Sequence, residues 1–590
     1  MKKYDEKHAN AFGFRSGFHK HFAGGAQWRS ALKNIELLQQ LVCCFSSSSS
    51  LLFVGFIDFS IYSGDSSQKS VIGLRRMPKA PDFPLDCPSW NQALTCPKNY
   101  PPNHKPATNA NRSLNLTCPG YFHWIHQYLR PWKETGITRD MMEKARVAAN
   151  FRLAILNGKV YVEKYRKSLQ SRDLFTLWGI VQLLRWYPGR LPDLELIFNC
   201  HDRPVIRSRD YRRPNAGPPP LFKYCSDGWS LDIVFPDWSF WGWAETNIRP
   251  WKNVLEEIKA GNKRSKWKDR VPLAYWRGNP RVAATRGDLL RCNVTDKFDW
   301  NARLYVQDWI KESREGYKQS NLGDQCTYRY KIYVEGWAWS VSEKYILACD
   351  SPTLLIMPRY YDFFLRGMVP LKHYWPIKSN SKCKSIKFAV EWGNNYTAEA
   401  QAIGEASSRF IQEDLKMEYV YDYMFHLLSE YAKLLKFKPI IPPNAFELCS
   451  ESMVCPADGN RKRFMDESLV KAPTDAVPCT LPPYEPSALG ALFDKAGTSA
   501  KQVEMWENEY WDKFKRFLLE PGNLKSLQKL LLFHIIPGRV GSNHWPKDSS
   551  ETSLHNTLCK DTHEQLTLHH AKSGVKSVDL ANVVRPDDVV

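Results

Sequence analysis

Short apolar runs alternate with amphipathic segments along the central part of the chain, from about residue 137 to residue 435. Runs at 151–156 and 159–163 flank Asn157-Gly158, a dipeptide typical of a two-residue hairpin turn. We therefore predict an antiparallel strand pair there. Four further apolar runs predict buried strands, at 194–199, 273–276, 328–334 and 353–357.

Helical patterns lie between these strands. Thr138 stands before an amphipathic segment as a plausible N-cap, and 175–187 has a strong apolar face. Further helices are predicted from near Thr285, at 340–348 and over most of 398–435. Alternation of this kind predicts α/β layers with parallel strands, and its length is enough for two such domains.

The two ends of the chain have a different composition. Residues 1–40 are basic and polar, which favours a cytoplasmic leader, and the apolar segment 41–62 is interpreted as a weak signal anchor. A run of five Ser and a carboxylate weaken that anchor. Residues 63–110 are polar and Pro-rich and are predicted to form a stem. The stretch 450–500 is again polar and Pro-rich, which favours a tail or linker within a C-terminal extension, 450–514.

Cysteines and glycosylation signals favour an oxidising compartment. Cys87, Cys96 and Cys118 lie where disulfides would supply order that a small core cannot. N-glycosylation triplets begin at Asn111, Asn115, Asn293 and Asn395. The 15 Cys are an odd number, so at least one thiol is unpaired or outside the lumen, with Cys43 and Cys44 as candidates. We expect a single-pass type II membrane protein of the Golgi or endoplasmic reticulum with a lumenal body.

Charge and aromatic content narrow the possible partners. A net charge of +20 favours anionic partners, but no nucleic-acid-binding signature occurs, so nucleic acid is not expected. The basic cluster 259–268 is interpreted as a solvated helix end. The 22 Trp indicate either large aromatic cores or flat surfaces that stack on sugar rings, and both alternatives stay open.

The segment 274–288 has the features of a phosphate-binding site. A strand runs into Arg277, Gly278 would allow close backbone approach, and Arg281 and Arg286 surround a helix start. Cations and helix N-termini at such a junction stabilise a diphosphate. No D-x-D triplet occurs, which favours a site without a metal. A surface loop with salt bridges is the alternative.

Asp202 follows the buried strand predicted at 194–199, and the ends of such strands are where α/β sites form. A carboxylate there can act as a general base, with His201 beside it in the cleft. An Asp that only caps the next turn is the alternative. Ser340 and Ser342 begin a predicted helix, where they can donate to phosphate or serve as plain N-caps.

A cluster of aromatic residues at 236–243 is the last candidate. It contains Trp238, Phe240 and Trp241 within a few residues, followed by Gly242. These side chains either line the substrate cleft as a platform for a sugar or acceptor, or pack inside a loop.

Five of these segments, taken in order, resemble a known family. They are His-Asp-Arg-Pro at 201–204, Pro-Asp-Trp-Ser-Phe-Trp-Gly at 236–242, Ala-Tyr-Trp-Arg-Gly-Asn-Pro at 274–280, Glu-Gly-Trp-Ala-Trp-Ser-Val-Ser-Glu-Lys at 335–344 and Leu-Ala-Cys-Asp-Ser at 347–351. The set resembles the Rumi-type (KDEL-motif-like) protein O-glucosyltransferases, and most of all their plant branch. The resemblance covers about residues 85–514 and is specific because the motifs are separated and in order.

The resemblance implies a GT-B-like pair of Rossmann-like domains, with the transferase body at 111–449. It implies an inverting, metal-independent transfer of glucose or xylose from a UDP-sugar to a protein or glycan hydroxyl, with no cofactor besides that co-substrate. Asp202 corresponds to the family's catalytic base, and Arg277 and Arg286 to its nucleotide-binding arginines. The animal enzymes carry an Arg near Ser342, whereas the plant branch commonly has this Ser.

A second resemblance begins near residue 517. Phe-Leu-Leu-Glu-Pro-Gly-Asn at 517–523, Leu-Leu-Leu-Phe-His-Ile-Ile-Pro at 530–537 and Asp-Leu-Ala-Asn-Val-Val at 579–584 are similar to part of a fasciclin domain. Residues 515–590 are therefore expected to form a partial α+β fasciclin-like tail. The alternative function is a catalytically inactive fold that binds cell-wall or matrix polysaccharide through its basic surface and this tail.

Overall fold

The computed structural model describes residues 85, 87, 96, 116–213, 217–296, 298–318 and 320–523, together with four short strands between 552 and 582. The predicted leader and signal anchor, and nearly all of the predicted stem, lie outside the described residues. None of the helices that the structure describes is both long enough and apolar enough to cross a membrane.

One sheet of six strands is built mainly from the first half of the transferase segment. Its strand order is β13-β2-β1-β3-β4-β6. The strands are β1 (Phe151–Leu156), β2 (Lys159–Lys164), β3 (Leu194–Phe198), β4 (Leu221–Lys223), β6 (Ile233–Val234) and β13 (Phe446–Leu448). The last three strands of the order, β3, β4 and β6, run parallel, whereas β1 is antiparallel to both β2 and β3.

The local predictions for this sheet are confirmed. β1 and β2 form the expected hairpin, and Asn157 and Gly158 both take the positive φ that such a turn requires, 50° and 75°. Thr138 is the N-cap of the helix Arg139–Arg146, which precedes β1 in the chain. Its hydroxyl accepts the backbone N–H of Met141 at 3.3 Å. Every residue of β3 is buried as predicted, including Glu195, whose carboxylate pairs with Arg139 and Arg152.

A second sheet has five strands, and all its pairs are parallel. Its strand order is β12-β10-β9-β7-β8. The strands are β7 (Val271–Gly278), β8 (Ala302–Val306), β9 (Tyr328–Tyr333), β10 (Thr353–Ile356) and β12 (Trp375–Ile377). The α/β class with parallel strands is therefore confirmed. β7 is longer than the predicted strand, so Arg277 and Gly278 belong to its end rather than to the loop beyond it.

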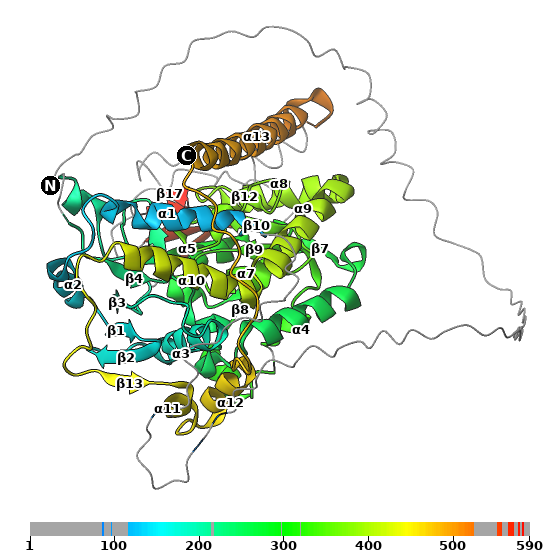
Figure 1. Cartoon of the computed structure of the whole chain (residues 1–590). Helices are drawn as coiled ribbons and strands as arrows, with labels where there is room; N and C mark the ends of the chain where they lie inside the picture. Colours follow the sequence, from blue (N-terminus) through cyan, green and yellow to red (C-terminus); the bar gives the residue numbers. More distant parts are fainter. Residues whose placement is uncertain are drawn as a thin grey trace, which may run out of the picture. The chain divides into compact units, whose positions relative to one another are not determined.

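Helices cover both sheets (Figure 1). They are α1 (His123–Leu129), α2 (Arg139–Arg146), α3 (Arg172–Trp186), α4 (Trp251–Arg264), α5 (Ala284–Leu289), α6 (Trp309–Arg314), α7 (Ser342–Leu347), α8 (Lys382–Asn395), α9 (Thr397–Arg409), α10 (Met417–Lys433), α11 (Ser450–Val454), α12 (Gly459–Ser468) and α13 (Pro486–Leu519). The prediction that most of 398–435 is helical is confirmed, and the segment consists of α9 and α10 with a π-helical turn between them at Phe410–Asp414. α10 returns to the first sheet, where it contacts β3 and α3, whereas α8 contacts three strands of the second sheet.

Each sheet has its own hydrophobic core. A short antiparallel pair, β5 (Ser226–Asp227) with β11 (Tyr360–Tyr361), joins a segment that follows β4 to one that follows β10. The main chain is therefore paired directly between the parts of the molecule that carry the two sheets.

The stretch 450–500, expected to be a tail or linker, is folded. It contains α11, α12 and the start of α13. The backbone of Val470 is held on both sides by α3, because its N–H donates to Gln182 at 2.8 Å and its carbonyl accepts from Arg185 at 2.9 Å. Polar, Pro-rich composition did not reveal this segment's contacts, which are made by its backbone with distant side chains.

Five disulfides fasten the described chain. Cys87, Cys96 and Cys118 are all bonded, as expected for their Pro-rich surroundings, and their partners all lie in the 449–479 segment. The pairs are Cys87–Cys455, Cys96–Cys449, Cys118–Cys479, Cys292–Cys383 and Cys326–Cys349. Cys200 and Cys225 are buried free thiols, whereas Cys43 and Cys44 lie outside the described residues.

The predicted fasciclin-like tail is described only in part. Beyond α13, its described strands form one antiparallel sheet in the order β14-β15-β16-β17. They are β14 (Thr552–Asn556), β15 (Gln565–His570), β16 (Lys576–Val578) and β17 (Ala581–Asn582). The fasciclin resemblance stays a prediction.

Packing of α3 on the aromatic segment gives the first testable prediction. A Cβ on Gly179 would lie 2.5 Å from the indole of the buried Trp241. We expect Gly179→Ala to lower the free energy of unfolding by about 1–3 kcal/mol, because overpacking outweighs the better helix propensity of Ala. The control is Gly490→Ala in α13, where no atom lies within 4 Å of the new methyl group, so its melting temperature should not fall. Equal melting temperatures of the two variants would contradict the predicted overpacking.

Candidate active site

Asp202 lies in the loop that follows the C-terminal end of β3, whose last residue is Phe198. Three contacts hold the residues before it: Cys200 N–H donates to Asn150 at 2.7 Å, His201 N–H to Asn199 at 2.9 Å, and Lys223 Nζ to Asn199 Oδ1 at 2.6 Å. The Asp202 side chain is 29% exposed. It therefore reaches solvent from a loop that is fixed by buried polar contacts.

Arg172 holds the Asp202 carboxylate, a contact that the sequence did not reveal. Its Nη1 is 2.8 Å from Asp202 Oδ1, and its guanidinium lies over the Trp238 ring, 4.4 Å from the centroid. No described residue contacts Asp202 Oδ2. Arg172 is the first residue of α3, and its partner Asp202 lies 30 residues further along the chain. Nothing in the local sequence around Arg172 indicates this pairing.

His201 and two thiols complete the surroundings of this carboxylate. Desolvation lowers the pKa of His201, with the charges of Lys223 and Arg172 adding to it, so the imidazole is neutral at pH 7. Cys225 Sγ donates to the Asp202 carbonyl at 3.1 Å. Burial raises the pKa of Cys200 to about 12 and that of Cys225 well above its usual value, so neither is a thiolate nucleophile.

The aromatic side chains expected in the cleft are buried. Trp238 and Phe240 are each 1% exposed and Trp241 is fully buried. Trp238 packs against Tyr224, and Trp241 Nε1 donates to the Tyr421 hydroxyl at 3.1 Å. The burial of these rings favours the packed-loop alternative, and their place at the substrate cleft stays a prediction. Trp238 supports the guanidinium of Arg172, which in turn holds Asp202.

Three of the predicted donor-binding residues meet beyond β9. Arg286 Nη2 donates to the Ser340 hydroxyl at 2.9 Å, and Ser340 Oγ is 2.8 Å from Ser342 Oγ. Arg286 also donates through Nε to the carbonyl of Glu335 at 3.0 Å. Burial lowers the pKa of Arg286, yet the guanidinium stays charged at pH 7.

The other predicted donor-binding residues are placed differently. Arg277 is turned toward the chain after β8, where Nε donates to Gln307 at 2.5 Å and Nη2 is 3.1 Å from Glu312. Arg281 is exposed, and no described residue contacts its side chain. Gly278 leaves room for the neighbouring indole of Trp276, 2.5 Å from where a Cβ would lie.

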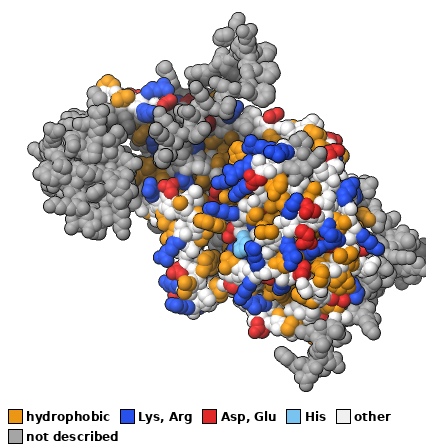
Figure 2. Space-filling model, turned by 90° about the vertical axis from the view of Figure 1, so that its left-hand side faces the viewer, with side chains coloured by type: hydrophobic (Ala, Val, Ile, Leu, Met, Phe, Trp, Pro, Cys, Tyr) orange, Lys and Arg blue, Asp and Glu red, His pale blue; other side chains and the backbone are white. Residues whose placement is uncertain are grey.

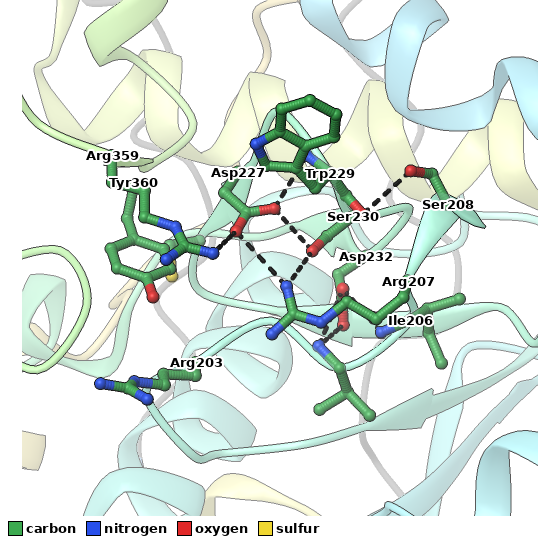
Figure 3. A network of polar contacts seen from close by, with 12 residues as sticks. Arg203, Ile206, Arg207, Ser208, Asp227, Trp229, Ser230, Asp232, Arg359 and Tyr360 are labelled. Atoms are coloured by element: carbon green, nitrogen blue, oxygen red, sulfur yellow. Dashed lines mark hydrogen bonds and ion pairs between the residues drawn. The ribbon is translucent and has the colours of Figure 1, made fainter. Parts of the chain in front are cut away.

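A buried carboxylate, Asp227, joins segments from both halves of the site (Figure 3). Its Oδ2 is 3.4 Å from Arg207 Nη1 and 3.3 Å from Arg359 Nη2, and its Oδ1 accepts from the Ser230 hydroxyl at 2.7 Å. The hydroxyl of Tyr361 donates to its carbonyl at 2.8 Å. Sequence reasoning missed this residue because neither arginine is near it in the chain.

A second contact brings the Asp202 loop to the chain after β9. Arg203 Nε donates to the carbonyl of Trp337 at 3.2 Å, and its guanidinium lies 3.8 Å from the Trp337 ring centroid. Arg203 directly follows Asp202, and Trp337 lies between Glu335 and Ser340. The proposed base and the Arg286 cluster therefore belong to one region.

Two other features of the described residues do not belong to this region. A hollow of about 770 Å³ is lined by the basic cluster at the C-terminal end of α4, including Lys259, Lys263 and Lys266, and contains none of the predicted site residues. Cys118, His426 and Cys479 lie within ligand distance of one another, but the two cysteines form a disulfide and are not metal ligands.

A two-sheet α/β fold with cations gathered beyond parallel strands is typical of enzymes that bind phosphate-bearing substrates. The chain belongs to glycosyl transferase family 90, whose model matches residues 113–507. It is 24% identical over 348 residues to O-glucosyltransferase rumi of Drosophila melanogaster, covering 57% of this chain and 82% of the relative. It is 26% identical over 352 residues to human Protein O-glucosyltransferase 1, covering 57% and 84%. The Rumi-type resemblance is confirmed at this level, whereas membership of the plant branch stays a prediction.

Asp227 gives a prediction about the stability of this region. We expect Asp227→Asn to lower the free energy of unfolding by about 1–2 kcal/mol, because two arginines lose their shared charge partner. This loss of stability is smaller than for a fully buried ion pair, because the side chains of Arg207 and Arg359 are 33% and 57% exposed. In the control, Asp210→Asn, the lost partner is the exposed Arg209, and we expect no measurable change. Thermal unfolding of both variants decides this, and a stable Asp227→Asn protein would contradict it.

Proposed function

We propose that the chain is an inverting O-glycosyltransferase that moves glucose or xylose from a UDP-sugar to a hydroxyl of a protein or glycan. The observation that carries the proposal is the fixed Asp202 carboxylate, with one oxygen on Arg172 and the other without a contact to any described residue. The printed names of the relatives, O-glucosyltransferases, support an O-linked product. The pair of sheets with separate cores supports a GT-B-like arrangement of the donor and acceptor halves.

In this mechanism Asp202 is the general base. Its Oδ2 takes the proton of the acceptor hydroxyl while the acceptor oxygen bonds to the anomeric carbon from the face opposite the nucleotide. The bond between the anomeric carbon and the phosphate oxygen breaks, and its electron pair leaves with UDP. Arg172 holds Oδ1, so the carboxylate cannot rotate away from the hydroxyl.

Arg286 stabilises the leaving diphosphate, with Ser340 and Ser342 as hydroxyl donors beside it. A guanidinium that is fixed by backbone carbonyls costs little reorganisation when negative charge develops on the phosphate. Arg281, exposed in the turn after β7, adds positive charge there, whereas Arg277 at the end of β7 is paired with Glu312 and has to leave it to reach the diphosphate. No cofactor beyond the UDP-sugar enters this proposal.

We also propose a lumenal location, in the Golgi or endoplasmic reticulum, behind the weak N-terminal anchor. The five disulfides support it, because such bonds persist in oxidising compartments. The plant-branch assignment and the partial fasciclin tail belong to the same proposal and rest on sequence motifs alone.

The base assignment is tested by Asp202→Asn. The amide keeps the shape but cannot take the proton, so we expect acceptor-dependent UDP release to fall about 10²–10⁴-fold, with UDP affinity unchanged. The control is Asp512→Asn, an exposed change in α13 outside the proposed site, which should retain full activity. If acceptor-dependent release is unchanged in Asp202→Asn, the base assignment is wrong; if the unaltered enzyme shows none with any acceptor, an inactive polysaccharide-binding fold is favoured.

The diphosphate assignment is tested by Arg286→Lys. Lysine keeps the charge but cannot reach two carbonyls, a serine hydroxyl and a phosphate at once, so we expect the Kd for UDP to rise about tenfold. Arg281→Lys, at a side chain without described contacts, should change it less than twofold. Calorimetric titration with UDP measures both, and equal affinities for the two variants would contradict the assignment.

A further inference from the structure

The loop that leaves Asp202 is rich in arginine. Between Asp202 and Pro214 it contains five, at positions 203, 207, 209, 212 and 213, and one acidic residue, Asp210. The Arg209, Arg212 and Arg213 side chains are exposed. The mechanism above uses none of these five residues.

The backbone of this loop is held firmly. The Asp232 carboxylate accepts the N–H groups of Val205 and Ile206, both at 3.0 Å. The Ile206 carbonyl accepts from Leu231 N–H at 2.8 Å, and Ser208 N–H donates to the carbonyl of Trp229 at 2.9 Å. The segment from Val205 to Ser208 is therefore fixed, and little order has to be gained there when a ligand binds the arginine that projects from it, Arg207.

The positive charge of this edge is only partly balanced. Arg359 joins the five loop arginines through Asp227 (Figure 3), which makes six guanidinium groups. Four carboxylates lie among them or pair with their backbone: Asp210, Asp227, Asp232 and Glu335. Burial raises the pKa of Asp232 to about 6 and raises that of Glu335. Asp210 is the exposed carboxylate of the four, so the surface presented to solvent is cationic.

Two exposed indoles lie on the same edge. Trp229 is 68% exposed and Trp337 is 52% exposed, whereas the Trp residues of 238–241 are buried. The backbone of Trp229 is bonded to Asp227 and Ser208, and Trp337 lies under the Arg203 guanidinium. Large indoles left in water beside arginines are a feature of binding surfaces, because each supplies a rigid apolar face. Lys, Arg and hydrophobic side chains are interspersed on the molecular face drawn in Figure 2.

We propose that this edge binds the acceptor and that the acceptor is an anionic glycan whose sugars carry carboxylates. The proposal rests on the proposed function, because it takes the hydroxyl to be activated as the one beside Asp202. Guanidinium forks match carboxylates in a bidentate manner, and indole faces stack on the apolar faces of pyranose rings. A neutral glycan would gain nothing from the six arginines, and an acidic peptide would gain little from the two indole faces.

The charge half of the proposal is tested with Arg212→Gln/Arg213→Gln. The matched control is Arg264→Gln/Lys433→Gln, which removes two exposed cations at the ends of α4 and α10. The probes are an oligogalacturonate, a neutral xylo-oligosaccharide of equal length and a poly-Glu peptide of equal charge. We expect the loop variant to bind oligogalacturonate about tenfold more weakly than the control, with affinity that falls as salt rises. Equal binding by the loop variant and the control would overturn the proposal.

The sugar half is tested with Trp229→Ala. It should weaken binding of oligogalacturonate severalfold and leave binding of poly-Glu unchanged, because the peptide has no pyranose face to stack. Tighter binding of poly-Glu than of oligogalacturonate would identify an acidic peptide instead and overturn the proposal. Equal affinity for the neutral xylo-oligosaccharide and for oligogalacturonate would also overturn the proposal. UDP affinity is measured on every variant: loss of glycan binding with UDP binding intact concerns this edge alone, whereas an unaltered protein that binds no UDP contradicts the proposed function.

Discussion

The buried carboxylate of Asp227 is the interaction on which the arrangement of the site depends. A charge with no exposure to water is tolerated only when cations and hydrogen-bond donors surround it, and here they come from segments 20 and 132 residues away along the chain. Arg359 supplies one of these cations, and β11, which directly follows Arg359, pairs with β5, the strand that contains Asp227. The chain that follows β10 is thereby placed beside the loop that carries Asp202.

The proposed chemistry follows from this placement. Asp202 is held by Arg172 on one side, and Arg203 is held by Trp337 on the other, so the loop is fixed between α3 and the chain after β9. Arg286 is fixed to the carbonyls at the end of that same strand. The chain belongs to glycosyl transferase family 90, and the proposed base and the proposed phosphate-binding arginine lie in one region of its fold. The arginine-rich loop and two exposed indoles define the proposed acceptor edge.

The aromatic segment 236–243 shows that one composition is compatible with two opposite placements, exposed as a binding surface or buried in a core. The sequence left open whether the segment 236–243 is a sugar platform or a packed loop, since both use the same residues. Its rings are buried against α3 and α10, while Trp229 and Trp337, which the sequence did not single out as a platform, are exposed. Whether a side chain is buried depends on which distant residues pack against it, and the local sequence pattern does not contain this information.

The sequence by itself determined the local elements: the Asn157-Gly158 hairpin, the Thr138 cap, the buried β3 and the position of Asp202 after it. Turns, caps and periodicity act over a few residues, so they can be recognised without the fold. Tertiary structure alone decided that Arg172 holds Asp202, that Cys118 pairs with Cys479, and that Arg286 meets Ser340. These partners are 30, 361 and 54 residues apart, so only the tertiary packing of helices and loops against the sheets brings them together.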